Sequence, residues 1–134
     1  MICLNITIQS ENQKLDVAYE DFKKLRIKIA ELTGDEIGDH YKNMNVGVHL
    51  FGTSQSKFID DYNKRIIELE KEFEIPSGIL NFLYQPEFEG KIASVECAQI
   101  YEKIKDCKST VIVFKNFKKI IKDCIDNNCD LTWE

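Results

Sequence analysis

The sequence predicts a helix-rich α+β fold in a single domain over residues 1–134, with about four to five helices and a small sheet of about two to three strands. Its 134 residues are 43% apolar, which is enough to build one hydrophobic core. The first residues alternate apolar and polar with the period of a strand, whereas most later apolar residues recur with the period of a helix. Six Gly and two Pro are few breakers for such a chain, and this favours helices.

The N-terminal segment predicts a strand followed by an amphipathic helix. Apolar residues at every second position from Ile2 to Ile8 predict a half-buried strand, which the polar run 9–13 ends. From about Asp16 the spacing becomes that of a helix, and Gly34 is placed to end it. The apolar face of this helix consists of Ala18, Phe22, Leu25, Ile29 and Leu32.

The middle of the chain predicts one extended segment and two helices. Residues 46–51 read as a short strand among scattered glycines. A long amphipathic helix follows and breaks before Pro76, and a short apolar helix over 79–83 ends before Pro86. The shared face of the long helix consists of Phe58, Tyr62, Ile66, Leu69 and Phe73.

The C-terminal third predicts two helices and a closing strand. Apolar residues at 97, 100, 101 and 104 share a helix face, with Ser94 placed to cap it. A second helix over 113–125 has one apolar side, and Asn127-Asn128 can terminate it. Residues 131–133 predict a short strand that can pair beside the first one. The polar side of the last helix holds Lys115, Lys118, Lys119 and Lys122.

Charge is distributed unevenly along the chain. The formal net charge is -5, and residues 35–100 hold twelve Asp and Glu against six Lys and Arg. Such acidity favours another protein with a basic surface as partner and disfavours nucleic acid. With no apolar run long enough to cross a bilayer and no signal-peptide pattern, we expect a cytoplasmic protein without membrane contact. The five cysteines are an odd number and are expected to be reduced.

The sharpest local motif is the segment Gln85–Glu96, which resembles the twelve-residue calcium loop of an EF-hand. Glu87, Glu89 and Glu96 stand at three ligand positions, and Gly90 stands where that loop needs a glycine for its turn. The segment departs from the EF-hand pattern at position 1, where Gln85 replaces Asp. Two interpretations therefore stay open: a weak calcium site, or a metal-free helix-loop-helix that keeps the bend.

The other chemically reactive residues favour structural roles. No C-x-x-C pair is present, since the closest cysteines are Cys124 and Cys129, and His40 and His49 lie far from them. Cys97 and Cys124 fall on apolar helix faces, as small core residues do. The chain lacks a nucleophile elbow, a phosphate loop and a zinc-protease motif. The histidines are expected to be structural, and the lysines of the last helix to form a solvated face.

The C-terminal region resembles a group of small uncharacterised bacterial and prophage-type proteins. The resemblance rests on residues 114–133 (FKNFKKIIKDCIDNNCDLTW), Glu89-Gly90-Lys91-Ile92 and Cys97, and covers roughly the last 50 residues. In those relatives the loop carries a D-C-D-G or D-C-E-G core, where this chain has Glu87-Phe88-Glu89-Gly90. The resemblance implies a compact single domain and no established activity. Families of this kind occur in mobile elements and bacterial conflict, and this setting suggests by analogy an immunity or inhibitor protein.

These observations lead to three functional hypotheses. The preferred one is a non-enzymatic, acidic protein-binding module that docks on a basic partner surface. The second is a cation-binding helix-loop-helix domain that uses Glu87, Glu89 and Glu96 for calcium, with no other cofactor expected. The third is a small enzyme whose site assembles from residues distant in sequence, such as His40 or His49. The partner-binding residues expected under the first hypothesis are Glu70, Glu72, Glu74, Glu87 and Glu89.

Overall fold

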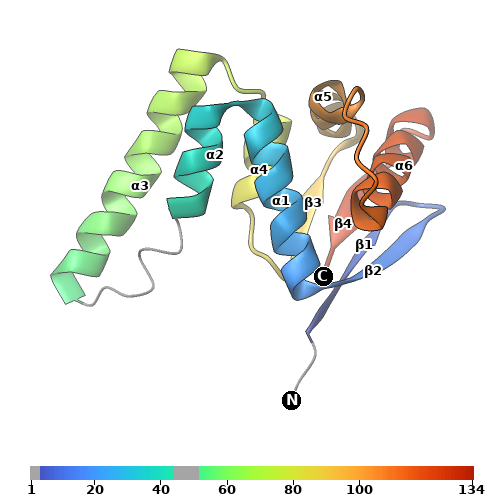
Figure 1. Ribbon diagram of the computed structural model, residues 1–134, viewed down its shortest axis with the longest axis horizontal. Coiled ribbons are helices and arrows are strands. Elements are labelled where there is room, and N and C mark those ends of the chain that lie inside the picture. Colours follow the sequence, from blue (N-terminus) through green and yellow to red (C-terminus); the bar gives the residue numbers. More distant parts are fainter. Residues whose placement is uncertain (1–3, 44–51) are drawn as a thin grey trace.

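The computed structural model describes residues 4–43 and 52–134, and over these ranges the chain forms six α-helices and one four-stranded antiparallel sheet (Figure 1). The predicted helix-rich α+β class is confirmed, with at least one helix and one strand more than expected. In chain order the elements are β1 (Asn5–Gln9), β2 (Lys14–Ala18), α1 (Tyr19–Thr33), α2 (Asp35–Lys42), α3 (Gly52–Phe73), α4 (Ser77–Tyr84), β3 (Gly90–Ile92), α5 (Ser94–Ile104), α6 (Ile112–Asp126) and β4 (Leu131–Trp133).

The sheet has the strand order β2-β1-β4-β3, so the last strand pairs beside the first one as the sequence predicts. One row across it joins Leu15, Ile8, Trp133 and Gly90, and these residues face the helices. The alternate row is polar and contains Gln9, Thr132 and Lys91. The sheet is therefore buried on one face and polar on the other, as is common for antiparallel sheets.

The helices α1, α4 and α6 pack on the apolar face of the sheet, and the core lies between the two layers (Figure 1). Trp133 is central to it, because its ring lies 5.3 Å from Phe82 and 6.1 Å from Phe22 between centroids. Phe117 of α6 extends this aromatic cluster from Phe82 at 5.1 Å. In Figure 1, α3 stands at the left edge beside α2 and away from the sheet. No helix within residues 4–43 and 52–134 has the length and apolar character of a membrane span.

The N-terminal elements differ from the prediction in two ways. The predicted helix is present as α1, but its predicted start at about Asp16 is wrong, because Lys14–Ala18 form β2 and α1 begins at Tyr19. Val17 lies opposite Ile6 in the hairpin and is buried, whereas Ala18, which fits the helical spacing, is exposed, so strand pairing outweighs that spacing. The helix α2 was not predicted, although Gly34 does end α1. The predicted strand over 46–51 lies outside the described residues.

Candidate functional site

The segment Gln85–Glu96 packs firmly against α1. Arg26, which is buried, donates a hydrogen bond from Nη2 to the carbonyl oxygen of Gln85 at 2.9 Å. Tyr19 donates its hydroxyl proton to Glu87 and stacks on Phe88, with 5.3 Å between ring centroids. Burial and the hydrogen bond to Glu87 raise the pKa of Tyr19 to about 12. These contacts use the first half of the loop to join α1 to β3.

Arg26 is a buried cation held mainly by aromatic faces. Its guanidinium carbon lies 4.8 Å from the ring centroid of Phe22, 5.5 Å from that of Trp133 and 5.6 Å from that of Phe82. Burial lowers the pKa of Arg26, whereas the nearby Tyr41 hydroxyl and the charge of Glu87 oppose this effect. The Arg26 side chain thus fixes the start of the loop from within the core.

The three glutamates expected to bind calcium do not converge. Glu87 is engaged with Tyr19, and Glu96 accepts hydrogen bonds from the Ala93 backbone N–H at 3.2 Å and from Asn81. Glu89 is exposed. In the described part of the chain, no three Asp, Glu, His or Cys side chains are grouped so that they could hold a metal ion.

Glycine is required at position 90 for a reason other than the turn of a calcium loop. Its backbone is not in the left-handed region, and it lies opposite Trp133 in the sheet. A Cβ at this position would lie 1.9 Å from Cζ2 of Trp133. Glycine is therefore required here because the indole ring occupies the space of a side chain.

The start of α5 also differs from the prediction. Ser94 is the first helical residue and not the N-cap, which is Ala93. The Ser94 hydroxyl instead donates to the carbonyl oxygen of Cys124 at 3.0 Å and so joins α5 to α6. Glu96 takes over the capping role through its bond to the Ala93 N–H.

His40 is hydrogen-bonded through both ring nitrogens. Its Nε2–H donates to the backbone oxygen of Tyr62 at 3.0 Å, and its Nδ1 accepts from the Tyr84 hydroxyl at 2.8 Å. The Tyr62 ring stacks on the imidazole at 3.9 Å between centroids. Burial lowers the pKa of His40, so the neutral form is favoured. His40 thus joins α2, α3 and α4, while His49 lies outside the described residues.

The cysteines of α5 and α6 belong to the core. Cys97 and Cys124 are buried, and the four cysteines of the described ranges form no disulfide. Asn128 has a φ of 49°, and the N–H of Cys129 bonds to the carbonyl oxygen of Cys124 at 3.0 Å. This is a Schellman ending, which confirms the predicted helix stop at Asn127-Asn128. The hydrogen bond with Cys97 and burial raise the pKa of Cys124, which opposes thiolate chemistry.

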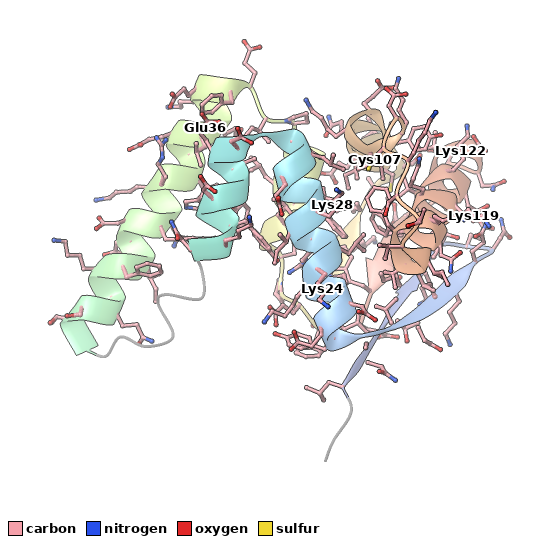
Figure 2. All side chains as sticks on the ribbon, in the orientation of Figure 1. Lys24, Lys28, Glu36, Cys107, Lys119 and Lys122 are labelled. Atoms are coloured by element: carbon pink, nitrogen blue, oxygen red, sulfur yellow. The ribbon has the colours of Figure 1, made fainter. Side chains whose placement is uncertain are left out.

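The lysines of α6 line a shallow depression of about 540 Å³ beside α5; Figure 2 labels Lys119 and Lys122. Lys118 donates to the carbonyl oxygens of Lys105 at 3.0 Å and Cys107 at 3.3 Å. Lys122 pairs with Asp126 at 3.0 Å and lies 5.9 Å from the ring centroid of Tyr101. The lysines therefore lie near the ring of Tyr101. The sequence pattern of α6 does not reveal this neighbour, because Tyr101 belongs to α5.

The five glutamates expected to bind a partner do not form one patch. Glu70 lies near the C-terminal end of α3 and Glu74 directly follows that helix, before α4. Glu87 and Glu89 follow the other end of α4. Glu72 pairs with Arg65 at 3.6 Å on another side of α3. Of the five, Glu70 and Glu74 remain as neighbouring candidates.

The C-terminal end of α3 combines acidic and apolar side chains. Phe73 is 43% exposed and lines a small cleft that also contains Glu36 of α2. In Figure 2, Glu36 lies beside the upper end of α3. We define the acidic end of α3 as Glu36, Glu70, Phe73 and Glu74. Sequence reasoning missed Glu36, because only the packing of α2 against α3 brings it there.

Most of α3 is exposed along its length. Of its 22 residues, Leu69 is the one that is buried. Ile59 and Ile67 are 49% and 56% exposed, and by their spacing Ile59, Ile67 and Glu70 lie on one side of α3, whereas Ile66 packs against the core. This outer face, with the acidic end, is the candidate binding site. Ile27, in contrast, packs against the core.

Comparison with known proteins identified no protein family, no curated protein and no solved structure that matches this chain.

Proposed function

We propose that the protein is a non-enzymatic protein-binding module that docks on a basic surface of another protein through α3. The observation that carries this proposal is the exposure of the 22-residue helix α3, in which Leu69 is the one buried residue. The apolar side chains of Ile59, Ile67 and Phe73 are about half exposed to solvent. Long helices are stabilised mainly by burial of an apolar face. The outer face of α3 contributes little to the core, and a partner surface can bury it.

The backbone conformation of Glu74, at the acidic end of α3, is one that favours glycine. Glu74 has a φ of 50°, in the left-handed region where glycine is preferred after a helix. A residue with a Cβ costs about 1–2 kcal/mol there. The N–H of Ile75 bonds to the carbonyl oxygen of Glu70 at 3.2 Å, so Glu74 is the left-handed residue of the helix ending and presents a carboxylate where glycine is common.

The charges at the end of α3 also oppose the helix dipole. Glu70 and Glu72 lie near the C-terminal end, where the partial charge of the helix is negative and cations are favoured. Glu72 is compensated by Arg65, but Glu70 has no ion-pair partner among residues 4–43 and 52–134. A basic partner would remove this repulsion.

Inhibitor and immunity proteins fit these properties, because they neutralise a toxin or defence enzyme by covering part of its surface. A basic target surface with an apolar pocket for Phe73 would satisfy both parts of the site. Association driven by these glutamates weakens with salt.

Affinity capture from lysate of the source cell, analysed by mass spectrometry, tests the proposal. The double variant Glu70→Lys/Glu74→Lys is expected to lose the partner captured by the wild-type protein. The matched control Glu11→Lys/Glu20→Lys makes the same charge change at exposed positions distant from α3 and should retain it. Equal capture by both variants, or capture insensitive to salt, contradicts the proposal.

A further inference from the structure

A second surface with an apolar centre and positive charge lies between α1 and the start of α6. The cleft there has a volume of about 240 Å³. α1 contributes Lys24 and Lys28 to its wall, and Figure 2 shows both on this helix. The other wall contains Ser109, Val111 and Val113. The buried side chains of Leu25 and Phe114 also line the cleft, so its inner part is apolar.

The segment that enters α6 exposes apolar side chains to an unusual degree. Val111 is 60% exposed and Ile112 is 72% exposed, more than any apolar residue of α3. Single exposed apolar residues are ordinary, but Val111 lines the cleft and the exposed Ile112 directly follows it, so the two extend the apolar surface at the start of α6. Val111 and Ile112 are not part of the core, since the apolar side of α6 that packs against it begins with Val113 and Phe114.

Positive charge around the cleft is only partly compensated. Lys24 and Lys28 make no ion pair with any residue of the described ranges, and Asp21 is the carboxylate that lines the cleft with them. The first turn of α6 contains no acidic residue, and its N-cap Val111 provides no side-chain hydrogen bond. The positive end of the α6 dipole and its free N–H groups therefore add to the two lysines.

We propose that this cleft binds an acidic amphipathic helix of a partner protein. Carboxylates of such a helix would pair with Lys24, Lys28 and the first-turn N–H groups of α6, and its apolar face would cover Val111 and Ile112. A phosphate-rich ligand would use the same charges but would leave the apolar patch in water. A helix with apolar residues at helical spacing uses both features.

Fluorescence anisotropy with a labelled probe peptide tests this proposal. The probe is an amphipathic peptide of about 18 residues with Leu at helical spacing and Glu elsewhere. A peptide of the same composition in scrambled order is the reference. The intact protein is expected to bind the amphipathic peptide more tightly, with an affinity that falls as salt increases.

Variants separate the two parts of the site. Lys24→Glu/Lys28→Glu and Ile112→Ser are each expected to weaken binding by about tenfold or more. The control Lys64→Glu/Lys71→Glu makes the same charge change on α3 and should alter affinity less than about twofold. Circular dichroism establishes that each variant is folded. Because Glu70→Lys/Glu74→Lys should bind the peptide normally, the outcome does not depend on the function proposed for α3.

Three results would overturn the proposal. The first is equal binding of the scrambled peptide, and the second is wild-type affinity in Ile112→Ser. The third is loss of binding in the α3 control. If only the lysine variant loses binding and inorganic triphosphate competes fully, the cleft is an anion site and not a protein-docking site.

Discussion

Replacement of Gly90 by alanine tests how the edge strand β3 fits against the core. The added Cβ would lie 1.9 Å from Cζ2 and 2.0 Å from Cε2 of Trp133. Non-bonded carbon atoms pack at about 3.5–4 Å, so the ring or the strand must move by about 1.5–2 Å. Trp133 resists this movement, because it is buried among aromatic rings and its Nε1–H donates to the carbonyl oxygen of Pro86 at 3.0 Å.

The magnitude follows from two contributions. Overpacking in a close-packed core costs about 1–3 kcal/mol, and loss of the hydrogen bond between Trp133 and Pro86 adds about 1 kcal/mol. Gly90→Ala should therefore lower the free energy of unfolding by about 2–4 kcal/mol, a large part of the 5–15 kcal/mol that is typical of a domain. Urea unfolding followed by fluorescence of the single tryptophan measures this, since Trp133 is itself the reporter.

Gly34→Ala is the matched control, because its backbone is extended and the nearest atom to an added Cβ is 3.9 Å away. It should change stability by less than about 0.5 kcal/mol. In a Trp133→Leu background, where unfolding is monitored by circular dichroism, Gly90→Ala should also lower the free energy of unfolding. The decrease should be at least about 1 kcal/mol smaller than in the protein that retains Trp133. The same urea midpoint and emission maximum for Gly90→Ala, Gly34→Ala and the wild-type protein would refute the steric account.

Three further predictions concern other parts of the fold. Gly78→Ala should lower the melting temperature, since its Cβ would lie 2.5 Å from the carbonyl oxygen of Glu96; an unchanged melting temperature would show that α4 and α5 separate easily. Glu74→Gly should raise the free energy of unfolding by about 1 kcal/mol in urea titrations, because it removes a left-handed glutamate; a loss of stability would contradict this. The pKa of His40 is lower in the folded state, so the unfolded chain binds the proton more readily. The stability that neutral His40 contributes is therefore fully present above the unfolded pKa of about 6.5 and is lost as pH falls through and below that value. Unfolding free energies measured from pH 8 to 5 should therefore decline less in His40→Gln, and equal slopes would exclude His40 as the cause.

Millimolar calcium tests the second functional hypothesis directly. Because Glu87, Glu89 and Glu96 do not converge, calcium should leave the melting temperature and the Trp133 emission unchanged relative to the protein with chelator. Magnesium at the same concentration controls for ionic strength. A rise in melting temperature specific to calcium would support the ion loop that the sequence suggests.

Much of the fold can be predicted from local pattern. The helices α3, α4, α5 and α6 follow from apolar spacing and from the breaks before Pro76 and Pro86, which act within a few residues. The strand β2 could not be separated from α1 in the same way, because Ala18 also fits the helical spacing of α1. The pairing of Val17 with Ile6 decides in favour of a strand, and that pairing depends on the hairpin turn.

The candidate site was less predictable, because its parts meet only through packing. Glu36 reaches the end of α3 from α2, and Tyr19 engages Glu87 from a distant element. The EF-hand pattern at Gly90 was misleading for a physical reason. A glycine required by a cross-strand tryptophan looks the same in sequence as one required by a turn.

The attachment of α3 has a thermodynamic consequence. Its contacts with the rest of the chain include one fully buried residue, Leu69, and the hydrogen bond that His40 makes to Tyr62. A helix held by so few contacts should open at a lower free energy than the sheet and α6, and so exchange its amide hydrogens sooner. A ligand that covers α3 would slow this local exchange before it altered global unfolding. Hydrogen exchange along α3 would thus locate the bound face even for a partner of unknown structure.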